Sequence, residues 1–185
     1  MKKVIYIEGS HEMDNGDLRK AFAKLLEKEL QGNMPRVIMG DGKNQTIDKF
    51  HSTPLTPDEQ RFLLVDSDGP VLDKETICSS FNEEKPNRKK NCTIDNTFLM
   101  IQEAEAWVLS QPEILQQNKI KTVKLPQRNV MEIHKPSEML ALLYKDSGKE
   151  YHKVRDFSHL LPEIDTIKLK AYFEEFNELV KGLKK

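Results

Sequence analysis

The stretch 61–70, Arg-Phe-Leu-Leu-Val-Asp-Ser-Asp-Gly-Pro, places the strongest constraint on the fold of this 185-residue chain. Residues 62–65 are apolar without interruption, which is typical of a short strand buried on both faces inside a parallel sheet. Asp66 and Asp68 follow where such a strand would leave the sheet. Ligand sites of open α/β sheets lie at the carboxyl ends of the strands. The stretch therefore predicts a central parallel strand with two carboxylates at its ligand-facing end.

These two carboxylates indicate a cation site. Residues i and i+2 of an extended chain point to the same side, so Asp66 and Asp68 are expected to face one ion. Close like charges are costly unless a cation compensates them. Magnesium is typically held by one or two carboxylates, with water and substrate phosphate completing its shell. A plain polar strand exit, punctuated by Gly69-Pro70, is the alternative interpretation of the same residues.

A second acidic strand end lies earlier in the chain. Residues 4–7 form another short apolar run, and Glu8-Gly9 follows it directly. Residues 17–30 then repeat apolar side chains at the three-to-four spacing of a helix that packs on a core. These apolar residues are Leu18, Ala21, Phe22, Leu25, Leu26 and Leu30. Glu8 is therefore expected at the same kind of strand exit as Asp66.

The remaining sequence alternates between strand and helix patterns. Further strands are expected at residues 36–39 and 97–101, and helices at residues 44–50, at 72–81 and from about Glu103. Residues 82–96 are polar and basic and are expected to form an exposed loop. From residue 112 onward the pattern is helical, with segments expected at residues 136–144, 154–161 and 166–183.

This order of elements predicts an α/β fold. Strands that alternate with helices imply a parallel sheet with right-handed crossovers. We expect a Rossmann-like, mostly parallel sheet of about four strands flanked by helices over residues 1–111. A helical C-terminal extension over residues 112–185 is expected to pack on the same domain.

The amino-acid composition and net charge exclude several classes of protein. A chain with 37% hydrophobic and 32% charged residues is expected to be a globular protein with a well-solvated surface. Its net charge of -1 argues against a strongly basic nucleic-acid binder, although a local basic patch stays open. Cys78 and Cys92 fit no metal-ligand spacing and are too few for a disulfide scaffold. Without a long apolar stretch or the apolar core of a signal peptide, a reducing cytoplasm and no membrane partner are expected.

Glu103 and Glu105 are further acidic candidates, because they follow the fourth expected strand and precede Trp107. On a helix, residues i and i+2 lie about 200° apart, so only one of the two can face a site. The alternative is that both occupy a first helical turn, where acidic side chains favour the positive end of the helix dipole.

The chain resembles a bacterial family of small Toprim-like proteins along nearly its whole length. A strand, Glu-Gly, a helix, a further strand and Asp-x-Asp is the order in which a Toprim domain presents its metal site. The resemblance rests on Ile7-Glu-Gly9 with Leu18-Arg19, on Gly40-Asp-Gly-Lys-Asn-Gln-Thr-Ile-Asp-Lys-Phe50, on Leu64-Val-Asp-Ser-Asp-Gly-Pro70, on Met100-Ile-Gln102 with Glu105-Ala-Trp107, on His134-Lys-Pro136, and on Tyr151-His-Lys-Val-Arg155 leading into Leu160-Leu161.

Such proteins resemble the nuclease components of OLD and RloB-type systems, which are often encoded beside an ABC-type ATPase. The resemblance implies a Mg²⁺- or Mn²⁺-dependent nuclease that acts on nucleic acid, DNA rather than RNA, in defence against phage or mobile DNA. It assigns the metal site to Glu8, Asp66 and Asp68, and it favours Glu105 over Glu103 as a further catalytic acid. Glu8 is alternatively a general base, if the metal sits mainly on the two aspartates.

Phosphate contacts are expected from Lys135, Lys153 and Arg155. Lys153 and Arg155 precede an apolar segment and are expected near a helix N-terminus, which is a natural anion site. Solvated charges on a helix surface are the alternative interpretation.

The same residues bear on other classes of function. A non-catalytic Toprim-like module that binds and regulates a partner ATPase stays open. A nucleotide-sugar transferase could hold a metal diphosphate on Asp66-Ser-Asp68, but it would leave Glu8 unexplained. An EF-hand loop starting at Asp66 fails, because its sixth position would be Val71 and its twelfth Ile77.

Overall fold

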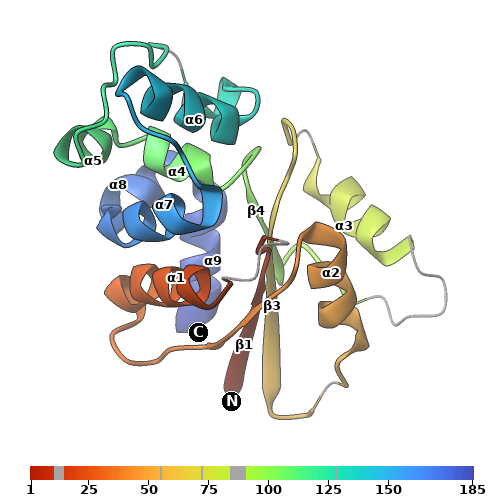
Figure 1. The fold of residues 1–185 in the computed structure, drawn as a ribbon. Helices are drawn as coiled ribbons and strands as arrows, with labels where there is room; N and C mark the ends of the chain where they lie inside the picture. The colour runs from red at the N-terminus through yellow and green to blue at the C-terminus, as the bar shows by residue number, and fades with distance from the viewer. Residues whose placement is uncertain (11–14, 55, 72, 84–90, 128) are drawn as a thin grey trace.

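The structure is a computed structural model that describes residues 1–10, 15–54, 56–71, 73–83, 91–127 and 129–185. Its centre is a four-stranded, all-parallel sheet with the strand order β2-β1-β3-β4, flanked by helices on both faces (Figure 1). The strands are β1 (Lys2–Ile7), β2 (Arg36–Met39), β3 (Glu59–Asp66) and β4 (Thr97–Met100). This arrangement confirms the α/β fold expected from the alternating pattern.

The two central strands are apolar on both sides because each side of the sheet faces a layer of helices. On β1, Val4 and Tyr6 belong to one buried cluster, whereas Ile5 and Ile7 belong to the other. In the sheet register Ile7 lies beside Leu64 of β3. Parallel strands in this register end together, so the residues that follow β1 and β3 meet at the carboxyl edge of the sheet.

One face of the sheet is covered by two helices, α2 (Lys43–Ser52) and α3 (Lys74–Glu83) (Figure 1). The opposite face carries α1 (Asn15–Leu30), α4 (Glu105–Leu109) and α9 (Glu174–Lys184). Trp107 of α4 lies at the centre of this second layer, with its ring 6.3 Å from Phe22 of α1 and 5.2 Å from Phe176 of α9. A single tryptophan thus joins three helices that are far apart in the sequence.

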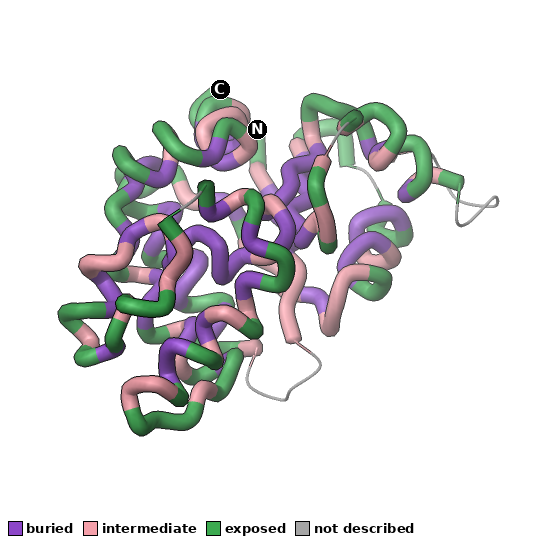
Figure 2. Tube along the Cα trace, turned by 90° about the horizontal axis from the view of Figure 1, so that it is seen from above, coloured by how far each residue is buried: buried purple, intermediate pink, exposed green. Residues whose placement is uncertain are grey.

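The C-terminal half adds helices to the same side as α1. They are α5 (Pro112–Gln117), the 3₁₀ helix η1 (Val130–Glu132), α6 (Pro136–Asp146), α7 (Lys153–Leu160), the 3₁₀ helix η2 (Leu161–Glu163) and α8 (Thr166–Tyr172). Their buried side chains belong to the cluster that contains α1 and one face of the sheet. Figure 2 shows that buried residues line the interior between the layers, whereas exposed residues lie on the outer turns. Helix α7 packs against α1 and brings its first turn to the carboxyl edge of the sheet.

Two expected elements differ from the structure. The single helix expected at 166–183 is divided into α8 and α9, because Phe173 has an extended backbone (φ −119°, ψ 101°). Its buried ring lies 6.5 Å from that of Trp107, and this packing turns the chain. Ile101, expected at the end of the fourth strand, lies beyond β4, since Gln102 turns into a left-handed conformation (φ 59°).

Two further expectations concern the basic stretch 82–96 and membrane-spanning segments. Within the basic stretch 82–96, residues 84–90 lie outside the described residues. Among the helices that the structure describes, none has the length and apolar character needed to cross a membrane.

Candidate active site

A cavity of about 390 Å³ opens at the carboxyl edge of the sheet, above the ends of β1 and β3. Residues from six parts of the chain line it: Glu8, Gly9 and Ser10 after β1, Leu18 and Phe22 of α1, Gly42 and Lys43 at the start of α2, Asp66 of β3, Met100, Ala104 and Glu105 around the end of β4, and Lys153, Val154 and Phe157 of α7. Carboxylates and lysines therefore share a hollow whose other walls are apolar.

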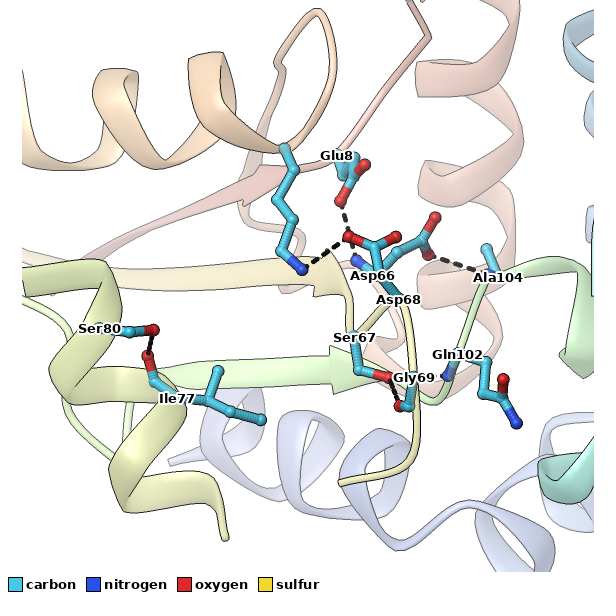
Figure 3. Close-up of polar contacts among 10 residues, drawn as sticks. Glu8, Asp66, Ser67, Asp68, Gly69, Ile77, Ser80, Gln102 and Ala104 are labelled. Carbon is cyan, nitrogen blue, oxygen red and sulfur yellow. Dashed lines mark hydrogen bonds and ion pairs between the residues drawn. The ribbon is translucent and has the colours of Figure 1, made fainter. Parts of the chain in front are cut away.

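Glu8 and Asp66 meet in this cavity because they leave adjacent parallel strands at the same level. The backbone N–H of Asp66 donates to Oε2 of Glu8 at 2.9 Å, and Oδ1 of Asp66 accepts from the backbone N–H of Ala104 at 2.9 Å (Figure 3). Asp66 is buried, at 7% exposure. The paired strand exits expected from the sequence thus bring these two carboxylates together.

Asp68 lies apart from this pair. The strand ends at Asp66, and Asp68 has a left-handed backbone (φ 56°) with its N–H bonded to the carbonyl of Gln102 at 2.9 Å. Its side chain is 65% exposed and accepts from Nζ of Lys43 at 2.9 Å. The same-side rule for residues i and i+2 holds only for an extended chain, so it does not apply here. In the part of the chain that the structure describes, no three His, Cys, Asp or Glu side chains are arranged to hold a metal ion.

Glu105 is the third carboxylate of the cavity and is fully buried at the start of α4. Its Oε1 accepts from the Tyr151 hydroxyl at 3.4 Å and lies 3.4 Å from Nζ of Lys153. Its Oε2 is buried without a hydrogen-bond partner among the described residues. A buried carboxylate oxygen without a donor is costly, and a bound cation would relieve that cost.

Glu103 has a different environment from Glu105. Its carboxylate accepts from the backbone N–H of Ser137 at 2.6 Å, in the first turn of α6. It therefore satisfies a helix N-terminus, where the free N–H groups favour an acidic side chain. Of the two candidate glutamates, the cavity contains Glu105.

The crowding of carboxylates raises their pKa values. Burial raises the pKa of Glu8 to about 7, with a further rise from Asp68 and an opposing effect of the N–H bond from Asp66. Burial, and then the charges of Glu8 and Glu105, raise the pKa of Asp66 well above its usual value. Burial also raises the pKa of Glu105, although Lys153 opposes this rise. The site is therefore short of positive charge, and its carboxyl groups retain protons at unusually high pH.

Of the three lysine and arginine residues expected to bind phosphate, Lys153 lines the cavity. It is the first residue of α7, and Glu105 and Asp66 raise its pKa even though burial alone would lower it. Lys135 pairs with Glu138 at 2.7 Å, and Arg155 pairs with Asp156 at 2.9 Å. Both of these pairs lie on the surface outside the cavity.

Lys43 and Tyr151 are site residues that sequence reasoning did not identify as such. Lys43 follows Gly40-Asp41-Gly42, a glycine-flanked turn between β2 and α2. That turn leaves the sheet at the same edge as Glu8, a signal that could have drawn attention to Lys43. Tyr151 reaches Glu105 from the segment before α7, and no local pattern indicates such a contact.

A larger hollow, of about 820 Å³, lies at the opposite end of the sheet, where Lys2 and Glu59 begin β1 and β3. Glu59 is the only carboxylate side chain among its described lining residues, and it bonds to Arg61 at 2.6 Å. This hollow lacks the grouped acids of the carboxyl edge, so the candidate chemistry lies in the smaller cavity.

The donor set of the smaller cavity suits a hard divalent cation. Glu8, Asp66 and Glu105 offer carboxylate oxygens, which Mg²⁺ and Mn²⁺ prefer over nitrogen and sulfur. The unpartnered Oε2 of Glu105 and the raised pKa values are further signs that the carboxylates lack a counter-charge. The donor types present therefore suit such an ion, while in the described residues they are not gathered into a group of three ligands and Asp68 stands outside the cavity.

Residues 8–184 match the model of a protein family described as a domain of unknown function, DUF4276. The match spans every element that lines the cavity, from Glu8 to α7. Comparisons with curated proteins and with solved structures found no match.

Proposed function

The chain belongs to the DUF4276 family, and we propose that it is a Mg²⁺- or Mn²⁺-dependent nuclease of the Toprim type that hydrolyses phosphodiester bonds of DNA. One observation carries the proposal: Glu8, Asp66 and Glu105 share a cavity with Lys153 at the carboxyl edge of a parallel sheet. This edge is where open α/β sheets bind their ligands. Glu8 and Asp66 would bind the ion, Lys153 would bind the substrate phosphate, and Glu105 would hold Lys153 in place.

Glu8 and Asp66 would hold the ion, and Asp68 would become a further ligand only by leaving its ion pair with Lys43. A bound Mg²⁺ or Mn²⁺ supplies polarisation of the phosphate and stabilises the attacking and leaving oxygens. If the metal instead sits mainly on the two aspartates, Glu8 would be free to act as the general base, and its raised pKa of about 7 suits that alternative role.

The remaining groups of the cavity position the substrate. Lys153 would contact a phosphate oxygen through Nζ, and Glu105 would hold that ammonium group in place from 3.4 Å away. Tyr151 donates its hydroxyl to the same Glu105 oxygen, which fixes the carboxylate from a second side. The apolar side chains of Leu18, Phe22 and Phe157 limit the access of water to these charges.

The biological setting is proposed from the resemblance of the sequence to OLD and RloB-type nuclease components. In that setting the chain acts with an ABC-type ATPase in defence against phage or mobile DNA. Co-purification of the chain with an ABC-type ATPase, and a loss of protection against phage on substitution of Asp66, would support this setting.

Cleavage by purified protein tests the enzymatic proposal. The protein, alone or together with any ABC-type ATPase that co-purifies with it, should cut labelled DNA in Mg²⁺ or Mn²⁺ and stop when a chelator is added. Asp66→Asn keeps the size of the side chain but removes a ligand charge, and it should abolish cutting. Glu138→Gln is the matched control, because Glu138 is an exposed acid that pairs with Lys135 outside the cavity. Equal cutting by wild type and Asp66→Asn would refute the assignment.

One observation favours a second candidate, a non-catalytic module that binds and regulates a partner ATPase. Asp68 stands outside the cavity and is paired with Lys43, so the described residues contain no ready-made three-carboxylate metal site. In such a module the same surfaces would serve protein binding without metal. Partner binding that is unchanged by chelator and by Asp66→Asn, with no cleavage under any condition, would favour this candidate.

A further inference from the structure

Lys43 occupies a position between the cavity and Asp68. It lines the cavity together with Glu8 and Asp66, yet its Nζ is bonded to Oδ2 of Asp68 at 2.9 Å. The Lys43 side chain is only 22% exposed, whereas that of Asp68 is 65% exposed. The ion pair therefore joins a lysine of the cavity wall to a carboxylate outside it.

The loop that carries Lys43 is fixed beside Glu8. The backbone N–H of Gly42 donates to the carbonyl of Gly9 at 3.0 Å, and the Thr46 hydroxyl donates to the carbonyl of Gly42 at 2.7 Å. A side chain at Gly40 would clash, because a Cβ there would lie 1.9 Å from Oγ1 of Thr46. These close approaches hold the start of α2 at one wall of the cavity.

The start of α2 is also suited to bind an anion. Gly42 precedes the helix with φ 85° and supplies no side-chain cap, and α2 is ten residues long. Its first N–H groups and the helix dipole favour negative charge at this end. Lys153 is the first residue of α7 and lines the same cavity, although the carboxylate of Asp156 already accepts from the backbone N–H of His152 at this helix start. Two helix starts, each with a lysine, thus border the carboxylates.

Glu105 supplies an independent sign that a ligand belongs in this cavity. Its side chain is fully buried, and its Oε2 has no partner among the described residues. A buried carboxylate oxygen without a donor indicates that a cation or a proton donor is to be bound there. A cavity that binds a cation beside two lysines has the charge pattern for a metal-bound phosphate.

We propose that Lys43 binds a phosphate of the substrate and, in doing so, gives up Asp68, which then becomes available to the metal. Phosphate binding and metal binding are thereby coupled through the exchange of one ion pair. The inference rests on the proposed function, since it concerns the metal and the nucleic acid that a nuclease binds. It adds Lys43 as a substrate-binding residue and gives the displaced Asp68 a role.

The backbone of Asp68 supports such an exchange. A positive φ is uncommon for a residue other than glycine, so the left-handed conformation of Asp68 is maintained by its N–H bond to the carbonyl of Gln102 and by the Lys43 ion pair, and loss of the ion pair removes one of these two restraints. In an extended conformation its carboxylate would lie on the same side of the chain as that of Asp66. While Asp68 is paired with Lys43, its carboxylate stays away from Asp66, and the metal site lacks this ligand.

A double-mutant cycle on metal binding tests the exchange. The Mn²⁺ affinity of wild type, Lys43→Met, Asp68→Asn and the double variant is measured from the electron paramagnetic resonance of free Mn²⁺, without nucleic acid. Lys43→Met should tighten Mn²⁺ binding by about threefold, because the released Asp68 can join the ion. In the Asp68→Asn background the same substitution should have less than about half of that effect, because the carboxylate that would join the metal is absent.

Binding of a fluorescent oligonucleotide in chelator gives the complementary readout. Lys43→Met should weaken this binding by about fivefold, as expected for the loss of a charge-assisted contact. Asp68→Asn should strengthen it, because Lys43 is then free for the phosphate. Lys49→Met is the matched control: Lys49 lies on the same helix, pairs with Asp41 at 3.7 Å and does not line the cavity. It should change neither affinity.

Each contrary outcome has a distinct meaning. If Lys43→Met weakens the binding of both Mn²⁺ and the oligonucleotide, Lys43 only maintains the shape of the site, and the exchange is refuted. An equal effect on Mn²⁺ in both backgrounds would show that its charge acts at a distance, which also refutes the exchange. If wild type binds Mn²⁺ but Lys43→Met alters nothing, the coupling fails while the metal site stands. If wild type binds no Mn²⁺ with or without oligonucleotide, the proposed nuclease function fails and the coupling with it.

Discussion

At the scale of single residues, the raised pKa values of Glu8 and Asp66 make the stability of the metal-free protein depend on pH. The folded chain holds a proton on Glu8 up to about pH 7, whereas the unfolded chain releases it near the ordinary glutamate pKa of 4.5. The folded state then binds more protons than the unfolded state, so the free energy of unfolding should fall as pH rises from about 5 to 7. Urea denaturation in chelator at several pH values measures this slope, and Glu8→Gln should reduce it. A stability that increases over this range would contradict the assignment.

Saturating Mn²⁺ should oppose this loss of stability. Ligand carboxylates must release their protons to bind a metal, so Mn²⁺ affinity should increase as pH rises through about 7. The difference in denaturation midpoint between metal and chelator should accordingly widen with pH.

Sequence reasoning at this scale succeeded where the local backbone is regular. Glu8 and Asp66 follow directly from buried parallel strands, and their meeting needed only the rule that such strands end at one edge. The position of Asp68 could not be obtained in this way, because its left-handed backbone depends on bonds to Gln102 and Lys43 that are distant in sequence. The same holds for Tyr151, whose contact with Glu105 spans 46 positions.

At the scale of the elements, the start of α2 depends on the absence of a side chain at Gly40. Gly40→Ala should destabilise the protein by about 1–3 kcal/mol, because its Cβ would meet Oγ1 of Thr46 at 1.9 Å and the helix start would have to move. Gly69→Ala is the control, since a Cβ there meets nothing within 4 Å, and it should change stability by less than about 0.5 kcal/mol. Urea denaturation of the two variants measures both costs. Equal stabilities would show that the turn relaxes freely.

The helices show which elements a sequence pattern can predict. Helix α1 was expected at 17–30 and spans Asn15–Leu30, because an apolar stripe fixes its face against the sheet. The break at Phe173 was not expected, since residues 166–183 carry apolar side chains at helical spacing on both sides of it. Only the three-dimensional packing of Phe173 beside Trp107 makes the turn favourable.

At the scale of the whole molecule, the melting temperature distinguishes a metal-dependent enzyme from a non-catalytic module that binds no metal. Millimolar Mg²⁺ or Mn²⁺ should raise the melting temperature of wild type, because a ligand that binds only the folded state stabilises it. A variant with both Asp66→Asn and Asp68→Asn should show no such rise. A parallel series with a short oligonucleotide is needed, since substrate phosphate completes the shell of such ions. If metal leaves the melting temperature of well-folded protein unchanged in both series, the non-catalytic module is favoured.

The overall architecture could be predicted from the alternation of strands and helices, but the helix that completes the wall of the cavity could not. Short apolar runs ending in polar turns were enough to predict the parallel sheet. The C-terminal helices were expected only as a packed extension, whereas α7 forms one wall of the cavity and places Lys153 beside Glu105. Such long-range placement depends on which helix surfaces fit one another, and the periodicity of one segment carries no such information.

The contribution of α7 to the cavity has a consequence for the order of events during synthesis. Glu8, Asp66 and Glu105 emerge from the ribosome before Lys153 and the apolar residues of α7 that complete the wall. Domains fold as units, and contacts between distant segments form late. A growing chain would therefore carry the three carboxylates and Lys43 without Lys153 and the apolar wall of α7 until translation is nearly complete. If the chain cuts DNA, this delay would leave unfinished chains without the lysine and the apolar wall that α7 supplies.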